Sequence, residues 1–227
     1  MRLGKTNLEV NKIGFGALPI QRRNMEDSIE ILHRAYESGI DFYDTARFYT
    51  DSEEKLGRAF EDVRENIYLA SKTAAETPED FWSDLETALK ELRTDYLDLY
   101  QHHNISFCPK EGDELAKAMA EAKEEGLIRH IGITTHKITF AHEAIESGLY
   151  ETLQYPFSYL SGEEELKLVE KCKSLDVGFI AMKAMGGGLL KNSKAAYAFM
   201  NQFDNVLPIW GIQHMSELEE FLHIQAI

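Results

Sequence analysis

Residues 67–100, IYLASKTAAETPEDFWSDLETALKELRTDYLDLY, hold one full repeat of the pattern that decides the fold. Ile67–Ser71 is a short apolar run that predicts a strand, and Tyr96–Tyr100 predicts the next strand. Between them a helix is predicted to begin after Thr77, because a capping threonine, a proline at the first helical position and two acids in the first turn are helix-start signals. A strand, a helix and a second strand in this order indicate a parallel pair joined by a crossover.

The same alternation runs along the whole chain. Strands are predicted at 13–18, 40–43, 67–71, 96–100, 127–133, 151–154, 177–182 and 206–210, and helices at 27–38, 53–60, 77–92, 114–125, 140–147, 163–174, 194–202 and 216–224. Eight strand–helix units predict an α/β fold, a closed (β/α)₈ TIM barrel, with residues 1–227 as one domain. An open dinucleotide-binding sheet ranks second, because GFGALPI at residues 14–20 lacks the third glycine of the GxGxxG fingerprint.

The composition narrows the classes of partner. The 227 residues carry 24 Lys and Arg against 39 Asp and Glu, a formal net charge of −15, which argues against nucleic acid and anionic membrane surfaces. No apolar stretch approaches the roughly 20 residues of a membrane span, and the first ten residues lack the apolar core of a signal peptide. Two cysteines, Cys108 and Cys172, are too few for a disulfide framework. We therefore expect a cytoplasmic protein.

Polar side chains gather where three successive strands are predicted to end. Asp44 and Tyr49 follow the second strand, Lys72 the third, and the pair His102-His103 the fourth. In a barrel these ends meet at one face, which is where chemistry is found. A phenol with a reference pKa of about 10 needs an adjacent ammonium to act as a general acid near neutral pH, and a carboxylate would hold that ammonium. A histidine would add a hydrogen bond to a substrate carbonyl.

Other chemistries remain open at this point. Asp44, His102 and His103 could in principle bind a metal, but no ligand-spaced set is clear, so no metal site is predicted. An isomerase or aldolase barrel is another alternative, with Lys72 as a Schiff base or His103 moving a proton. No serine or cysteine nucleophile beside a base is apparent.

The segment DFYDTARFYTDSEEKLGRAF at 41–60 is similar to DTAxxYGxSExxLG, the most specific motif of the aldo-keto reductase family. The sequence therefore resembles this family, whose members are NAD(P)H-dependent (β/α)₈ barrels that reduce aldehydes and ketones. Further matches follow in the family's order: SKT, DYLDLYQHHN, GLIRHIGITTH, LQYPFSY, AMGGGLL and IWGIQHMSELEEF. The likeness is greatest to a prokaryotic branch that often carries a C-terminal iron–sulfur region, which is absent from this sequence.

The resemblance implies a reaction and four catalytic residues. A hydride would pass from the nicotinamide to a carbonyl carbon of a small aldehyde or ketone, with Tyr49 protonating the oxygen. Lys72 would lower the pKa of Tyr49, Asp44 would pair with Lys72, and His103 would orient the carbonyl. His103 is preferred over His102 because the family histidine stands five residues after the aspartate that matches Asp98.

The resemblance also implies a cofactor site for NADPH or NADH. Its predicted residues are Gly16, Ala17, Asp44, Thr134, Thr135, Gln154, Met182, Lys183, Met185, Gly186, Gly187, Gly188, Gly211, Gln213, Glu217 and Glu220. Thr134 and Thr135 replace the usual Ser-Asn, and Met182 stands where the family commonly stacks an aromatic ring on the nicotinamide. The glycines 186–188 would leave backbone N–H groups free for the pyrophosphate.

Near the C-terminus the sequence departs from the family pattern. The segment 211–221 often carries an arginine or lysine for the 2′-phosphate of NADPH, whereas this chain has Gln213 and Glu217. A carboxylate beside a phosphate is unfavourable, so the sequence favours NADH as much as NADPH.

The predicted substrate pocket lies at the strand ends. Its residues are Leu18, Pro19, Phe48, His103, Asn104 and Phe157. The chain stops at Ile227, inside what should be the last helix of the family, so two interpretations stay open: a piece of a longer protein or a short member of the family. A cofactor-binding barrel with a regulatory role or reduced activity is the alternative to a reductase. The sequence does not determine the substrate or the oligomeric state.

Overall fold

The eight parallel strands of this computed structural model close into a barrel in chain order, each hydrogen-bonded to the next and the last to the first. The structure describes residues 1–225. Within them the strands are β1 (Gly14–Gly16), β2 (Phe42–Asp44), β3 (Tyr68–Thr73), β4 (Leu97–His103), β5 (Ile128–Thr134), β6 (Thr152–Pro156), β7 (Gly178–Met182) and β8 (Val206–Gly211). The predicted (β/α)₈ barrel is therefore confirmed, and the open sheet is not formed.

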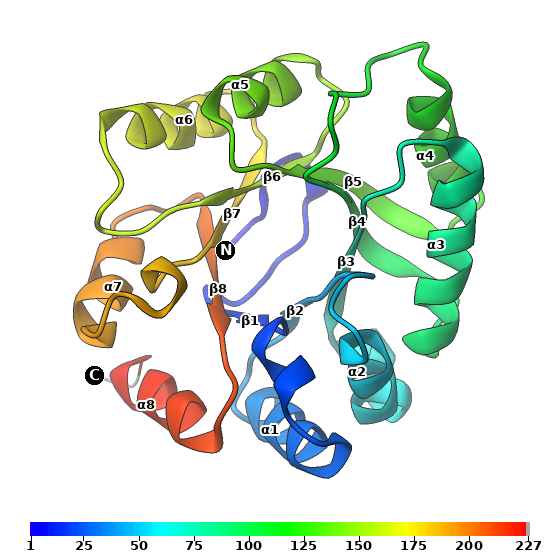
Figure 1. Cartoon of the computed structure of the whole chain (residues 1–227). Helices are drawn as coiled ribbons and strands as arrows, with labels where there is room; N and C mark the ends of the chain where they lie inside the picture. Colours follow the sequence, from blue (N-terminus) through cyan, green and yellow to red (C-terminus); the bar gives the residue numbers. More distant parts are fainter. Residues whose placement is uncertain (226–227) are drawn as a thin grey trace.

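The helices surround the barrel in a ring (Figure 1). They are α1 (Met25–Glu37), α2 (Ser52–Phe60), α3 (Pro78–Glu91), α4 (Glu114–Glu124), α5 (Ile138–Glu146), α6 (Glu163–Ser174), α7 (Ser193–Met200) and α8 (Met215–Gln225). The start of α3 follows the sequence signal, since the Thr77 side chain accepts a hydrogen bond from Asp80 N and Pro78 occupies the first turn. The main apolar core lies between this ring and the strands.

The first ten residues form a feature that the strand–helix alternation did not predict. Arg2 and Glu9 pair in an antiparallel bridge around the short 3₁₀ helix η1 (Gly4–Thr6), and Lys5 N donates to Asp176 O, just before β7. Figure 1 shows this segment crossing the centre of the ring. The apolar side chains Leu3, Leu8 and Val10 pack with those inside the barrel. The segment thus closes the barrel at the amino-terminal ends of its strands. The carboxyl ends remain open for the candidate site.

Two strand boundaries differ from the sequence expectation in a way that matters. Strand β4 continues three residues further than predicted, so that Gln101, His102 and His103 are strand residues. Strand β1 ends early, and Leu18 instead begins the 3₁₀ helix η2 (Pro19–Arg22). Because side chains alternate along a strand, the extension of β4 puts Gln101 and His103 on one face and His102 on the other.

Candidate active site

Asp44 and Lys72 form an ion pair at the carboxyl end of β2 and β3. Lys72 Nζ lies 2.7 Å from Asp44 Oδ2 and donates a second bond of 2.7 Å to Thr45 O. The two side chains are 3% and 1% exposed, and Gln101 Nε2 donates to Asp44 Oδ1 at 3.3 Å. Burial alone would lower the pKa of Lys72, but the negative charge of Asp44 and the Tyr49 oxygen outweigh it and raise that pKa. Lys72 is therefore an ammonium at neutral pH.

Tyr49 lies beside this ammonium. Lys72 Nζ is 5.0 Å from the centre of the Tyr49 ring, and the His103 ring approaches the same phenol edge-on at 5.9 Å between centroids. Tyr49 comes from the turn between β2 and α2, where its N–H bonds Ala46 O and its carbonyl accepts from Ser52 N. The structure thus brings together Asp44, Lys72 and His103, from three neighbouring strands, and Tyr49, from the turn after β2.

The two adjacent histidines face opposite sides of β4. Burial lowers the pKa of His103 to about 3, with Lys72 and His136 adding to the shift, so His103 is a neutral imidazole. Its Nδ1 has no hydrogen-bond partner in the part of the chain that the structure describes. His102 instead packs edge-on against Tyr150, at 6.2 Å between ring centroids, on the side away from Tyr49. Of the two histidines, His103 is therefore the one that faces Tyr49.

Thr134, at the end of β5, and Gln154, in the middle of β6, lie side by side as register partners. Both are buried, and Gln154 Oε1 is without a hydrogen-bond partner among the described residues. Thr135 has another role: its Oγ1 accepts from Lys137 N at 3.1 Å at the start of α5. Of the two threonines, only Thr134 has a side-chain hydroxyl that takes part in none of the hydrogen bonds described.

The glycine-rich loop after β7 only partly fits its expected role. Gly186, Gly187 and Gly188 all have positive φ, at 58°, 68° and 93°, in the 3₁₀ turn η4 (Gly186–Gly188). The Gly186 and Gly188 N–H groups already donate to Lys183 O and Met185 O, so these two N–H groups are not free for the pyrophosphate. Met182, at the end of β7, and Met185 are half-buried, and Lys183 is exposed.

The segment after β8 places a carboxylate at the start of α8. Glu217, in the first turn of α8, reaches back to the two residues before the helix: its Oε2 accepts from Gln213 N at 2.7 Å and from His214 N at 2.9 Å. Glu220 accepts from the Ser193 hydroxyl of α7. Gly211 lies under Pro19, and Gly16 lies against the backbone of Trp210 and Gly211. Ala17 is fully buried, and its N–H donates to Asp44 O at 2.9 Å.

The predicted substrate residues include exposed ones, namely Phe48, Leu18 and Asn104, and a buried one, Phe157. Phe48 is 70% exposed with its ring 6.1 Å from that of His103, and Leu18 is 44% exposed. Asn104 has φ +52°, and its Oδ1 lies 3.0 Å from His136 Nδ1. Phe157 is a correction: it is 1% exposed and packs on Phe179, Phe199 and Phe203 between the sheet and α7. A ring in that cluster lies in the core and does not line a pocket.

Sequence reasoning missed Gln101, which bonds the buried Asp44 carboxylate. The signal was present in QHH at 101–103, because a residue two positions before His103 on one strand must share its face. It was lost because the strand was predicted to end at Tyr100.

Two findings bear on other kinds of site. Among residues 1–225, no group of three or more His, Cys, Asp or Glu side chains is arranged to hold a metal ion. None of the helices in the same range combines the length and the apolar character needed to cross a bilayer.

The fold and the grouping of Asp44, Tyr49, Lys72 and His103 place the chain in the class of (β/α)₈ barrels with a polar site at the carboxyl ends of the strands. Residues 12–222 match the model of the Aldo/keto reductase family, and the chain belongs to this family. The resemblance found in the sequence is confirmed.

Relatives of known name and solved structures agree with this assignment. The chain is 29% identical to the uncharacterized oxidoreductase YqkF of Bacillus subtilis, over 83% of this chain and 65% of that protein. It is 28% identical to L-galactose dehydrogenase of Arabidopsis thaliana, over 83% and 66%. The chain spans 60% to 66% of the length of these curated relatives.

The structural likeness covers the whole chain. A putative aldo-keto reductase from Pseudomonas aeruginosa has a TM-score of 0.87 at 22% identity, covering 100% of this chain and 93% of that one. An aldo-keto reductase from Klebsiella pneumoniae in complex with NADPH has a TM-score of 0.85 at 22% identity, covering 100% and 89%. At this identity the likeness establishes the shared fold.

Proposed function

We propose that this chain reduces the carbonyl group of a small aldehyde or ketone to an alcohol, with NADH or NADPH as the cofactor. The observation that carries the proposal is the buried Lys72–Asp44 pair beside Tyr49, with the neutral His103 facing the same phenol. Family membership and the named oxidoreductases among the relatives support it.

The residues at the strand ends fit a nicotinamide. Gln154 Oε1 is a buried acceptor without a partner among residues 1–225, and a carboxamide N–H₂ would satisfy it. Thr134, its neighbour on β5, offers a hydroxyl at the same place. Gly16, Ala17, Met182, Lys183, Met185 and the 186–188 loop are proposed to contact the remainder of the cofactor. When bound, the cofactor supplies the hydride.

The four polar residues then have separate roles. Tyr49 O–H donates its proton to the carbonyl oxygen, and the positive charge of Lys72 stabilises the phenolate that remains. Asp44 holds the Lys72 ammonium in place through the 2.7 Å bond. His103, neutral because of its burial, donates a ring N–H to the same carbonyl oxygen and orients it. Phe48, Leu18, Pro19 and Asn104 are proposed to border the substrate.

The same proposal favours NADH over NADPH. In this family the segment that matches 211–221 meets the cofactor's 2′-phosphate, and here Glu217 already accepts the Gln213 and His214 N–H groups. A phosphate there would face a carboxylate and would find those donors occupied. Gly211, Gln213 and Glu220 complete the proposed contacts.

The test is a titration with NADH and NADPH separately, followed by tryptophan fluorescence, together with a benzaldehyde reduction assay. We expect saturable binding and turnover, and Tyr49→Phe should lower kcat by about 10²- to 10⁴-fold with cofactor affinity unchanged. Binding without turnover in the unmodified chain would favour a regulatory cofactor-binding barrel. Reduction that survives Tyr49→Phe undiminished would rule out Tyr49 as the acid.

A further inference from the structure

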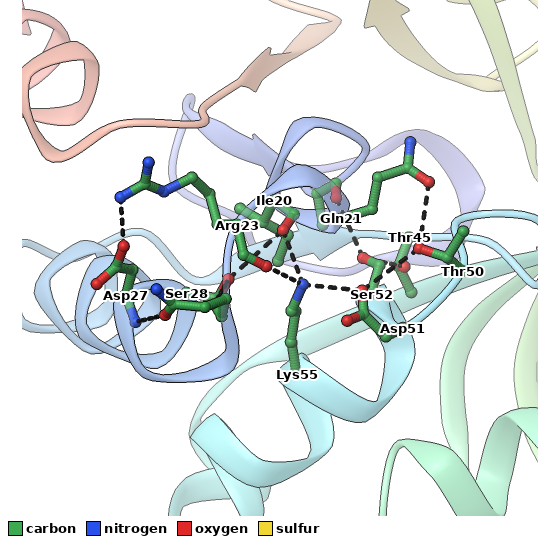
Figure 2. A network of polar contacts seen from close by, with 12 residues as sticks. Ile20, Gln21, Arg23, Asp27, Ser28, Thr45, Thr50, Asp51, Ser52 and Lys55 are labelled. Atoms are coloured by element: carbon green, nitrogen blue, oxygen red, sulfur yellow. Dashed lines mark hydrogen bonds and ion pairs between the residues drawn. The ribbon is translucent and has the colours of Figure 1, made fainter.

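Lys55 is a fully buried lysine that the proposed reaction does not use. It lies on α2 and is 0% exposed, with its Nζ directed at the loop that follows β1 (Figure 2). Nζ donates to Ile20 O at 3.0 Å, to Arg23 O at 2.7 Å and to Asp51 Oδ1 at 2.8 Å. An ammonium has three N–H donors, and all three are used. Because a buried charge is costly unless its hydrogen bonds are made, these three bonds specifically connect Lys55 to the segments that carry the acceptors.

Two of these acceptors belong to the loop between β1 and α1. This loop includes η2 and contains Leu18 and Pro19, which are proposed to border the substrate. It rests on the site itself, because Ala17 N donates to Asp44 O and Pro19 lies over Gly211. Without Lys55, the Ile20 and Arg23 carbonyls lose the N–H donor that fixes them to α2.

The third acceptor belongs to the turn that carries Tyr49. Asp51 ends this turn, which Ser52 closes by donating its N–H to Tyr49 O at 2.8 Å. Ser52 also ties the turn to the loop, since its Oγ donates to Ala17 O at 3.1 Å and accepts from Thr45 Oγ1 at 2.8 Å. Figure 2 shows Lys55 and Ser52 bridging the two segments side by side.

We propose that Lys55 is a positioning residue that holds the 17–23 loop and the Tyr49 turn in register with each other. This inference rests on the proposed function, in which Tyr49 gives the proton and the loop borders the substrate. Catalysis depends on placement at the scale of 1 Å, where an error costs about 100-fold in rate. Lys55 acts on the reaction only through the two segments that it joins.

The experiment compares Lys55→Met with a matched control at the other end of the barrel, Arg64→Met. Arg64 is also a buried cation bonded to one carboxylate and two backbone carbonyls, namely Asp98, Ile67 O and Tyr96 O, and in addition to the Thr94 hydroxyl. All four of its partners lie at or before the starts of β3 and β4, away from Tyr49. Both variants lose a buried cation, so a general loss of stability affects both alike.

Two readouts are taken on each variant: hydrogen–deuterium exchange and the kinetics of benzaldehyde reduction. For Lys55→Met we expect faster exchange in 17–24 and 45–52, and a kcat lowered by about 10- to 100-fold with cofactor Kd within about threefold. Arg64→Met should change neither segment and leave kcat within about threefold. The inference is overturned if the two variants show the same exchange in both segments, or if Lys55→Met keeps the unmodified kcat.

The readouts separate this inference from the proposed function. If the unmodified chain does not reduce benzaldehyde, the proposed function fails while the exchange pattern still decides whether Lys55 joins the two segments. If Lys55→Met does not fold, Asp51→Asn decides instead, because it removes only the charged partner. Faster exchange in 45–52 supports the connection, and unchanged exchange there overturns it.

Discussion

Lys72 and Asp44 form an ion pair across two neighbouring strands, with 2.7 Å between Nζ and Oδ2 and almost no solvent contact for either side chain. In the register of β2 and β3, Asp44 lies opposite Ala70, so that Lys72 reaches back from two residues further along β3. The same ammonium lies 5.0 Å from the Tyr49 ring centre. The pair thus fixes a positive charge next to the proposed acid.

Removing both members of this pair should cost less stability than the sum of the two single removals. We expect Asp44→Asn and Lys72→Met each to lower the free energy of unfolding by about 3 kcal/mol, because either change leaves a buried charge without its partner. The double variant should lose less than the sum, with a coupling of about 2 kcal/mol. Urea unfolding of the unmodified chain, the two single variants and the double variant measures this coupling.

The exposed pair Arg93–Glu61, with 2.6 Å between Nη1 and Oε2, is the control for this cycle. Its coupling should stay below about 1 kcal/mol, since solvent screens both charges. A coupling for Asp44 and Lys72 that is no larger than this control would contradict the expectation that burial strengthens the coupling of the pair.

Phe48 and Phe157 should respond in opposite ways to truncation. Phe157→Ala should lower the free energy of unfolding by about 3 to 5 kcal/mol, because the ring fills a buried aromatic cluster, with KM unchanged. Phe48→Ala should leave stability within about 0.5 kcal/mol and raise KM, because the ring is exposed beside His103. Thermal unfolding and benzaldehyde kinetics test the pair. If KM rose in Phe157→Ala and not in Phe48→Ala, Phe157 would line the substrate pocket after all.

How far the sequence predicts the fold is clear from particular residues. The barrel is predictable because its strands and helices are encoded locally: Thr77 and Pro78 mark the start of a helix, and short apolar runs mark the strands. Lys55 shows the limit: on sequence alone it is a polar residue of a helix, and its burial depends on the path of a loop more than thirty residues earlier.

Residues that follow a strand are harder to assign than the strand itself. Phe157 follows β6 and was predicted at the mouth, but the chain turns its ring towards α7, where three other phenylalanines pack. For Glu217 the sequence predicts a carboxylate near the cofactor, unfavourable to a 2′-phosphate. Its bonds to the Gln213 and His214 N–H groups depend on where α8 begins, which the sequence pattern does not fix to the residue.

Glu217 should select between the two nicotinamide cofactors. We expect the unmodified chain to bind NADH more tightly than NADPH, and Glu217→Gln to improve NADPH affinity by about 3- to 10-fold with little change for NADH, since it removes a negative charge near the 2′-phosphate. Glu219→Gln is the control, because Glu219 lies on the same helix but pairs with Arg34 at 2.7 Å. Fluorescence titrations give the four affinities. Equal gains for both variants would show a general charge effect in place of a specific one.

His102 should make the protein less stable as the pH falls. Burial lowers the pKa of His102 to about 3, whereas an unfolded chain has a histidine pKa of about 6.5. Between these values the unfolded state takes up a proton on His102 that the folded state excludes. The contribution of His102 to the free energy of unfolding is therefore constant above about pH 6.5 and falls below it. From pH 6.5 to pH 5 the loss due to His102 is about 2 kcal/mol. Urea unfolding at both pH values should show this slope reduced in His102→Gln. In His142→Gln, at a partly exposed position on α5, the slope should persist, and an equal reduction in both variants would contradict the assignment.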